Sequence, residues 1–236
     1  MDLEQNFATV RERIARACDR AGRSPDSVLL LPVTKGHPPE VITRAAALGF
    51  GIFGESKVQE LKAKIPLCPG RLRWHMIGHL QSNKARDAVQ FCEMIQSVDS
   101  LNLAQELQKR AESAARTLPI LLEVNIAGES SKFGYPPASV LADLPALNNL
   151  RRLEIHGLMA VPPWSPNPEQ SRPHFQKLRE LKERCEQSLG APLPTLSMGM
   201  SDDFEIAIEE GSTLIRLGTI LFGKRQKAPA DLKSAV

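Results

Sequence analysis

This sequence has few of the features that mark disulfide-rich, metal-binding or membrane proteins. Its four cysteines are widely spaced and form no Cys-X-X-Cys pair, which predicts reduced thiols rather than a disulfide framework or a zinc site (Cys18, Cys68, Cys92 and Cys185). No apolar segment approaches the ~20 residues that span a bilayer. The first residues show no basic region followed by an apolar stretch, so no secretory signal is predicted. We therefore expect a soluble cytoplasmic protein with no membrane partner.

Neither sign of charge is in large excess. The 236 residues include 30 basic and 27 acidic side chains, a formal net charge of +3 that is spread along the chain. This balance argues against a nucleic-acid partner and is compatible with a small anionic ligand. Hydrophobic residues make up 42% of the chain, and no linker or low-complexity segment divides it. One large domain is expected, as a monomer or weak dimer.

Short apolar segments alternate with longer amphipathic ones, which predicts a parallel sheet with helical crossovers. The candidate strands are 28–34, 50–54, 74–78, 94–98, 119–126, 155–161, 195–200 and 214–222. An opening helix is predicted over 7–21, and further helices over 39–48, 58–64, 83–91, 101–115, 136–144, 170–188 and 203–210. The sequence therefore predicts an α/β fold: a single-domain (β/α)8 TIM-type barrel with an extra N-terminal helix over 1–228, then a polar tail over 229–236. Pro32 conflicts with this prediction, because a barrel has no free edge where a missing N–H is harmless.

A lysine closes the first candidate strand. Lys35 follows the apolar run 28–34 and precedes the turn-forming residues 36–39. In (β/α)8 barrels the active site lies at the carboxyl ends of the strands. Desolvation there lowers the pKa of an amine and leaves a neutral fraction able to condense with an aldehyde. A lone lysine at a strand end is more often a surface residue, so this interpretation depends on the rest of the site.

Candidate phosphate-binding residues follow the seventh and eighth strands, a common position for phosphate in such barrels. Ser201 offers a hydroxyl, and Gly218 lets a phosphate approach the backbone amides of Gly218 and Thr219. An amine on one side of the barrel mouth and a phosphate site on the other fit an aldehyde that carries a phosphate. Pyridoxal 5′-phosphate is the cofactor with both groups.

Longer motifs carry a resemblance to a known family, and they occur in order over about residues 28–225. They are Val33-Thr34-Lys35, the segments 54–60, 74–84, 124–126, 131–134, 157–160, 196–203 and 211–213, and Arg216-Leu217-Gly218-Thr219. In these motifs the chain resembles the pyridoxal phosphate homeostasis proteins, the YggS/PROSC-like family, whose fold is similar to the barrel domain of alanine racemase.

The resemblance implies roles for individual residues. Lys35 matches the family lysine that forms a Schiff base with pyridoxal phosphate, and Arg216 matches the arginine that faces the pyridine nitrogen. Ser201, Gly218 and Thr219 match the phosphate contacts. Met200, His79 and Ser56 complete the predicted cofactor-binding set. After Gly54-Glu55 the family usually has Asn and then an aromatic or similar residue, whereas this chain has Ser56-Lys57.

Arg216 also bears on activity. A guanidinium can only donate hydrogen bonds, so a ring nitrogen that it contacts must be unprotonated, and such a ring is a weaker electron sink than a pyridinium. Two-base racemases of this fold gain a tyrosine from an extra carboxyl-terminal domain, whereas the only tyrosine here, Tyr135, lies in a predicted turn. We therefore expect no catalytic residue. The expected function is intracellular homeostasis of pyridoxal phosphate, buffering the cofactor and carrying it to apoenzymes that depend on it.

Three other functions stay open. A pyridoxal phosphate-dependent amino-acid racemase or lyase would need a second base near Cα of its substrate. A class I aldolase-type barrel would use Lys35 directly on a sugar phosphate. A protein that acts only through interactions would leave Lys35 inert.

Other patterns are interpreted structurally. His75 and His79 lie on a predicted strand where their side chains do not converge, so no metal site is predicted. Residues 49–54 fit Gly-X-Gly-X-X-Gly, but they follow a helix and enter a strand, so Gly49 is expected to end that helix. Asp202 or Ser201 is expected to cap the helix that follows.

The remaining lysines are expected at the surface. Lys57, Lys62 and Lys64 are predicted to form a solvated helix face. Lys84 and Lys132 are interpreted as surface lysines, with a second, looser site for an aldehyde as the alternative.

Overall fold

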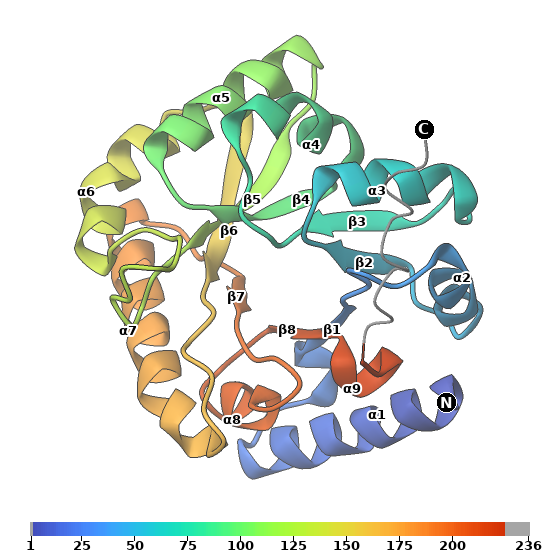
Figure 1. Ribbon diagram of the computed structural model, residues 1–236. Helices are drawn as coiled ribbons and strands as arrows, with labels where there is room; N and C mark the ends of the chain where they lie inside the picture. The colour runs from blue at the N-terminus through green and yellow to red at the C-terminus, as the bar shows by residue number, and fades with distance from the viewer. Residues whose placement is uncertain (1, 225–236) are drawn as a thin grey trace.

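Eight parallel strands form a ring around a central axis, with helices outside it, in the computed structural model, which describes residues 2–224 (Figure 1). The strands are β1 (Leu29–Pro32), β2 (Ile52–Glu55), β3 (Arg73–Met76), β4 (Met94–Val98), β5 (Leu118–Glu123), β6 (Leu153–Met159), β7 (Thr195–Ser197) and β8 (Leu214–Leu217). They are hydrogen-bonded in the order β1-β8-β7-β6-β5-β4-β3-β2. The predicted single-domain (β/α)8 barrel is confirmed, and the predicted tail 229–236 lies outside the described residues.

The helices are α1 (Leu3–Arg20), α2 (Pro39–Ala47), α3 (Val58–Lys64), α4 (Ala85–Phe91), α5 (Leu101–Ser113), α6 (Pro137–Asn148), α7 (Arg172–Leu189), α8 (Phe204–Glu209) and α9 (Thr219–Phe222). Short 3₁₀ turns precede or follow some of them: η1 (Pro25–Ser27), η2 (Ile65–Leu67), η3 (Ser82–Lys84) and η4 (Pro168–Ser171). Within residues 2–224, no helix is long and apolar enough to span a bilayer.

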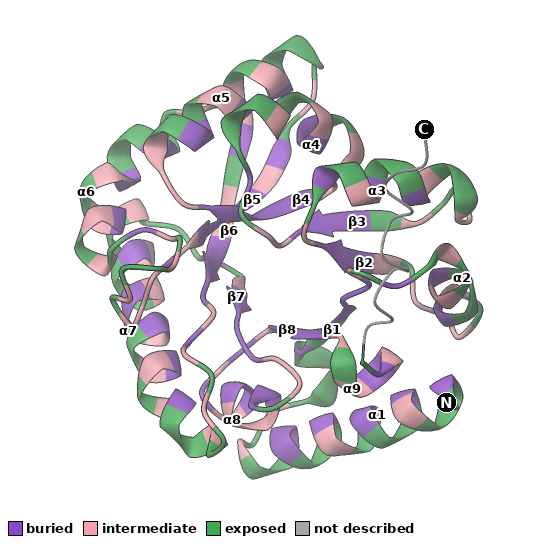
Figure 2. Ribbon diagram, in the orientation of Figure 1, coloured by how far each residue is buried: buried purple, intermediate pink, exposed green. Residues whose placement is uncertain are grey.

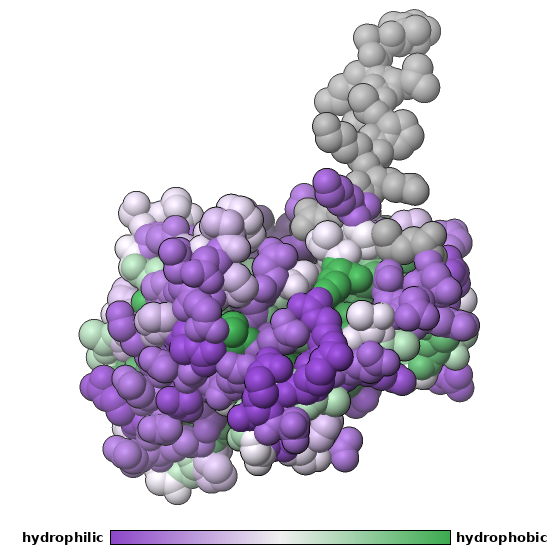
Figure 3. Space-filling model, turned by 90° about the horizontal axis from the view of Figure 1, so that it is seen from below, coloured by the Kyte–Doolittle hydropathy of each residue, from purple (hydrophilic) through white to green (hydrophobic). Residues whose placement is uncertain are grey.

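Helix α1 covers the wall of the barrel that the final helix is too short to cover. It packs against α8 and α9, beside β8 and β1 in Figure 1. Its buried face includes Phe7, Val10 and Ile14, and the Asp2 carboxylate accepts a hydrogen bond from the Gln5 amide at its start. The opposite face is solvated, and the side of the molecule in Figure 3 is mostly hydrophilic with small hydrophobic patches. The predicted N-terminal helix is therefore part of the barrel wall.

The core has two layers. The outer layer lies between the strands and the helices, whose inward sides are buried in Figure 2. A separate apolar cluster of Met94, Leu121 and Met159 fills the inside of the barrel. Because side chains alternate along a strand, Gln96 shares a face with Met94, and Glu123 shares one with Leu121. Polar side chains are thus placed inside the barrel, above an apolar floor.

The missing N–H of Pro32 removes no hydrogen bond between strands of the sheet. The Leu29 and Val33 amides of this strand donate to the β8 side, to Thr213 and Leu217, so the amide of residue 32 points toward β2. At this seam the contact is an isolated bridge between Val33 and Gly54, past the end of β1. The conflict expected from the sequence is resolved because the bridge on the β2 side forms only after the proline.

Some predicted boundaries are wrong. The last strand ends at Leu217, and the predicted continuation to Phe222 is helix α9. Helix α6 continues past Pro145 to Asn148, although we expected it to stop at Leu144. A proline removes one N–H from a helix, and packing of Leu144 and Leu147 in the core outweighs that loss. The first, third, fifth, sixth and seventh strands also end before the predicted residues, where the chain enters the loops of the barrel mouth.

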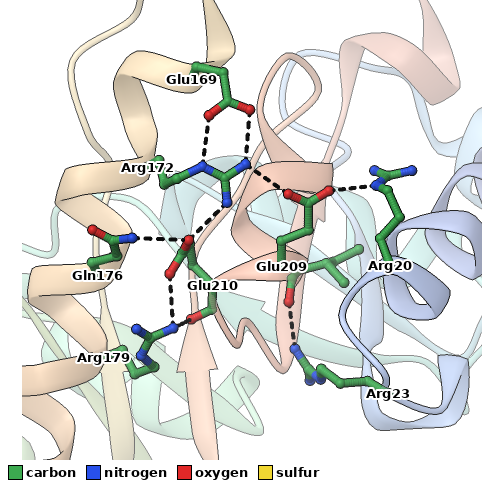
Figure 4. Close-up of polar contacts among 9 residues, drawn as sticks. Arg20, Arg23, Glu169, Arg172, Gln176, Arg179, Glu209 and Glu210 are labelled. Atoms are coloured by element: carbon green, nitrogen blue, oxygen red, sulfur yellow. Dashed lines mark hydrogen bonds and ion pairs between the residues drawn. The ribbon is translucent and has the colours of Figure 1, made fainter.

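A network of charged side chains ties α8 to α7 and α1 at the end of α8 (Figure 4). Arg172 bonds to Glu169, Glu209 and Glu210, at 2.7, 2.8 and 2.8 Å. Arg20 bonds to Glu209, and Arg179 to Glu210. Carboxylates at a helix carboxyl terminus face the negative end of its dipole, so these arginines offset an unfavourable field.

Candidate functional site

A cavity of about 250 Å³ opens at the carboxyl ends of the strands. Six of the residues predicted from the sequence line it: Lys35, Met200, Ser201, Arg216, Gly218 and Thr219. They come from the segments that follow β1 and β7 and from β8 and the start of α9. Apolar side chains of Val33, Ile77 and Val161 complete much of the wall. An amine, two hydroxyls and a guanidinium therefore face one space, although residues 35 and 216 are distant in the sequence.

Ser56 and His79 are not among the residues that line this cavity. The His79 ring stacks on Phe133, with centroids 3.5 Å apart, and His79 Nδ1 lies 2.9 Å from a carboxylate oxygen of Asp99. Ser56 packs against Gly78, where an added Cβ would lie 2.4 Å from the Ser56 carbonyl oxygen. Both residues lie on loops that follow strands, but the structure gives them partners outside the cavity.

The loop after β7 is held by its own side chains. The Asp203 carboxylate accepts hydrogen bonds from the Met200 amide at 2.8 Å and from the Ser171 hydroxyl at 2.9 Å. Asp202 accepts from the Trp164 indole at 3.0 Å. Ser201 Oγ accepts from the Ile220 amide at 3.3 Å, which joins this loop to α9. The expectation that Asp202 or Ser201 caps α8 is wrong: α8 has no side-chain cap, and these two residues accept from Trp164 and from Ile220 of α9 instead.

The start of α9 lies close to β1. The chain leaves β8 at Leu217 and turns into the helix at Gly218, so Thr219 lies in the first helical turn rather than on a strand. A Cβ added to Gly218 would lie 3.2 Å from the carbonyl oxygen of Val33. A side chain there would crowd the barrel wall, which gives the glycine a packing reason as well as the predicted one of access to backbone amides.

Arg216 begins a chain of hydrogen bonds inside the barrel. Its side chain is 4% exposed, donates through Nη1 to Ser197 Oγ, and donates through Nη2 to the Ala160 carbonyl at 2.9 Å. The Ser197 hydroxyl donates to Gln96 Oε1 at 2.7 Å, and Gln96 Nε2 lies 2.9 Å from His75 Nδ1. The chain therefore links β8, β7, β4 and β3 across the barrel.

The direction of every bond in this chain follows from its first donor. A guanidinium has no acceptor, so Ser197 accepts from Arg216 and must pass its own proton to the Gln96 carbonyl oxygen. The Gln96 amide then faces His75 and donates to Nδ1, which assigns the histidine proton to Nε2. Burial lowers the pKa of His75 to about 4, with the charge of Arg73 adding to the effect. His75 is therefore a neutral acceptor at the end of the chain.

Charge inside the barrel is unevenly compensated. Burial lowers the pKa of the Arg216 guanidinium to about 10, so it stays protonated at neutral pH. Burial raises the pKa of Glu123 to about 7, against the opposing effect of the Arg216 charge. One oxygen of Glu123 is buried without a hydrogen-bond partner among the described residues. Near neutral pH this carboxyl group is thus divided between its charged and neutral forms.

Sequence reasoning missed several residues of this region. His37, which was not among the predicted site residues, lines the cavity, and its ring lies 5.4 Å from that of Phe222. Gln96 and Ser197 are polar residues within otherwise apolar strands. That pattern could have predicted that they form hydrogen bonds inside the barrel. The expectation of a solvated Lys64 is wrong: it is 6% exposed and hydrogen-bonded beside Lys35. Lys62 and Lys57 are exposed as predicted.

Known proteins match almost the whole chain. Residues 5–226 match the family model described as alanine racemase, N-terminal domain. A pyridoxal phosphate homeostasis protein of Aquifex aeolicus is 43% identical over 227 residues, which cover 96% of this chain and 100% of the relative. The protein of the same name in Pseudomonas aeruginosa is 42% identical, over 97% of this chain and 99% of its own. Among solved structures, PipY of Synechococcus elongatus PCC7942 with PLP bound matches with a TM-score of 0.83 at 37% identity, covering 94% of this chain and 100% of PipY.

Proposed function

Because this chain belongs to the family of alanine racemase N-terminal domains and pyridoxal phosphate homeostasis proteins, we propose that it binds pyridoxal 5′-phosphate covalently through Lys35. Its role is then to buffer and carry this cofactor rather than to catalyse a reaction with it. The observation that carries the proposal is the convergence of the Lys35 amine, the Ser201 and Thr219 hydroxyls and the Arg216 guanidinium on one cavity. The relatives named for homeostasis of this cofactor support it.

The chemistry of the lining residues fits the cofactor. Pyridoxal phosphate supplies an aldehyde, which a neutral amine attacks with loss of water, and a phosphate at the other end of its ring. Lys35 is half-buried in the loop that follows β1 and lines the cavity. Ser201 and Thr219 present hydroxyls, and the backbone amides at the start of α9 lie beside them. We assign Lys35 to the aldehyde and Ser201, Gly218 and Thr219 to the phosphate, with Met200 beside the ring.

Arg216 favours a carrier over an enzyme. Its pKa stays well above neutral, so it can only donate to a ring nitrogen, and that nitrogen must then be unprotonated. The Ser197 and Ala160 contacts hold the guanidinium in place. Tyr135, the only tyrosine in the sequence, is buried in the outer core and does not line the cavity. The sequence contains no second tyrosine that could act as a base on Cα of an amino acid.

We place this carrier in the cytoplasm, with apoenzymes that depend on pyridoxal phosphate as the receivers of its load. All four cysteines are free thiols in the fold, and three of them are buried, as suits a reducing compartment. Release requires only that an incoming amine displaces the Lys35 amine from the carbon that both attack, since that exchange leaves the number of bonds unchanged.

Visible absorption of the purified protein with pyridoxal phosphate, before and after borohydride, tests the proposal. We expect a visible band that borohydride removes, and a phosphopyridoxyl group on the peptide that contains Lys35. Lys35→Ala should lose the band, whereas Lys62→Ala, at an exposed position, should keep it. A protein that stays colourless would overturn the proposal. Rapid exchange of the Cα proton of L-alanine in deuterated water would instead favour the racemase alternative.

A further inference from the structure

Lys64 is the lysine whose environment differs most from a surface position. It ends α3 with a side chain that is 7% exposed, and its amine makes three hydrogen bonds. The acceptors are the Thr34 carbonyl oxygen at 2.8 Å, Glu55 Oε1 at 2.7 Å and Glu60 Oε1 at 2.6 Å. We call Lys64, Glu55 and Glu60 the Lys64 cluster. It lies behind the loop that carries Lys35, outside the residues that line the cavity.

The cluster holds both neighbours of Lys35. On one side, Lys64 donates to the Thr34 carbonyl, and the Thr34 hydroxyl donates to Glu55 at 2.8 Å. On the other side, the Gly36 amide donates to Glu60 Oε1 at 2.6 Å. Glu60 Oε1 thus accepts from Lys64 and from Gly36 at once. One set of charged groups therefore reaches the chain immediately before and immediately after the reactive lysine.

These contacts constrain the direction of the Lys35 side chain. The Thr34 carbonyl belongs to the peptide group before Lys35, and the Gly36 amide belongs to the one after it. The angles φ and ψ of Lys35 describe rotation of these two planes about its Cα. Because the cluster holds both planes, it also fixes the direction of the Cα–Cβ bond of Lys35. The turn that follows requires a left-handed φ, and Gly36 adopts one of +71°.

Burying two charged groups, Lys64 and Glu55, with Glu60 partly buried beside them, is costly for a fold that needs only a loop at this position. Glu55 is fully buried, and desolvation raises its pKa although Lys64 and Thr34 oppose the shift. For Glu60, desolvation is outweighed by the hydrogen bonds from Lys64 and the Gly36 amide, so its pKa is lowered. Glu60 is therefore ionised at neutral pH, where it can accept hydrogen bonds from Lys64 and from the Gly36 amide.

We propose that Lys64 and Glu60 are positioning residues for Lys35, which aim its amine at the carbonyl carbon of the bound aldehyde. This inference rests on the proposed function. A covalent bond needs its atoms within a few tenths of an ångström of the productive geometry, and a small misplacement costs rate and affinity. The residues that we assign to the phosphate and ring of the ligand do not include the cluster, so their contacts should be independent of it.

The primary test compares Lys64→Met with Lys62→Met. Both lysines belong to α3 and both are ion-paired, but Lys62 is exposed and bonds to Asp87. Two ligands are titrated by absorption and calorimetry: pyridoxal phosphate, and pyridoxine phosphate, which lacks the aldehyde. We expect Lys64→Met to weaken pyridoxal phosphate binding by about 10- to 100-fold and to leave pyridoxine phosphate within about twofold. Lys62→Met should change neither.

A double variant separates positioning from general stability. Lys64→Met leaves Glu55 buried without its cation, so a lower melting temperature is expected. Adding Glu55→Gln removes that charge and keeps an acceptor for the Thr34 hydroxyl. The melting temperature should then recover while pyridoxal phosphate binding stays weak. Recovery of both together, or equal loss of both ligands in Lys64→Met, would overturn the inference.

A second pair of variants examines the other side of the loop. Glu60→Gln keeps an oxygen that can accept from the Gly36 amide, and Glu60→Leu does not. We expect borohydride to fix the aldehyde on Lys35 more slowly in Glu60→Leu than in Glu60→Gln. If wild-type protein forms no adduct at Lys35, the proposed function fails. If wild-type protein forms the adduct and Lys64→Met forms it equally well, only the positioning role fails.

Discussion

Replacing Gln96 by leucine should break the hydrogen-bonded chain inside the barrel at its centre. Gln96 is fully buried, its Oε1 accepts from Ser197 at 2.7 Å, and its Nε2 donates to His75 at 2.9 Å. In Gln96→Leu the Ser197 proton and the His75 lone pair both lose their partners. Water cannot replace the lost partners, because both side chains are buried inside the barrel.

The expected cost follows from the two orphaned groups. Each buried polar group without a partner costs about 1–3 kcal/mol, and the buried leucine returns about 1–2 kcal/mol. The middle of these ranges is a loss of about 4 kcal/mol for the two groups and a gain of about 1.5 kcal/mol, so Gln96→Leu should lower the free energy of unfolding by about 2.5 kcal/mol. The Ser197 hydroxyl also holds Arg216, so the affinity for pyridoxal phosphate should fall as well. Urea denaturation at pH 7 measures the first effect, with Gln90→Leu, an exposed site on α4, as the control.

A double-mutant cycle can refute this reasoning. In a Ser197→Ala background only the His75 nitrogen is left to be orphaned, so the same substitution at Gln96 should cost about 2 kcal/mol less than in wild type. An equal cost in both backgrounds would show that Gln96 and Ser197 are not coupled. A free energy of unfolding within about 0.5 kcal/mol of the wild-type value would show that the chain does not stabilise the fold.

Two further predictions concern charge. Burial raises the pKa of Glu123 to about 7 in the folded protein, above its ordinary value. Between these two values the folded state holds a proton on Glu123 that the unfolded state has lost. The free energy of unfolding should therefore fall as pH rises from about 5 to about 8. Glu123→Gln should flatten that dependence by up to about 3 kcal/mol in denaturation at the two pH values, and an unchanged slope would contradict the shift. Arg172→Met removes the centre of the network in Figure 4 and should cost about 1–2 kcal/mol while adduct formation at Lys35 continues. Loss of the adduct in that variant would mean that the network acts on the cavity.

The strand order and the positions of the chemical groups followed from local patterns. Short apolar strands alternating with amphipathic helices indicate a barrel because each strand must be covered, and strand ends must then meet at one mouth. That is why Lys35, Ser201 and Arg216, taken from three distant segments, line the same cavity as expected. Their contacts with a ligand stay predictions.

Local patterns misled where a side chain had two competing partners. Lys64 has the sequence surroundings of a solvated helix face, yet the carboxylates of Glu55 and Glu60 draw it into the protein. Ser201 and Asp202 precede a helix and match the pattern of a cap, yet the Ile220 amide and the Trp164 indole take their oxygens. A hydrogen bond to a partner far along the chain leaves no periodic signal.

The amino-acid sequence by itself determined the barrel, the position of Lys35 after the first strand and the polarity of the strands, because each depends on residues within a few positions of one another. Only the tertiary structure decided which polar groups meet inside the barrel, as in the chain from Arg216 through Ser197 and Gln96 to His75. It likewise decided that Lys64 and Glu60 hold the peptide groups on both sides of Lys35. These contacts form when the sheet closes and α3 packs behind the loop after β1. The pattern of apolar and polar residues along the chain does not specify which strands or helices become neighbours, so it could not predict them.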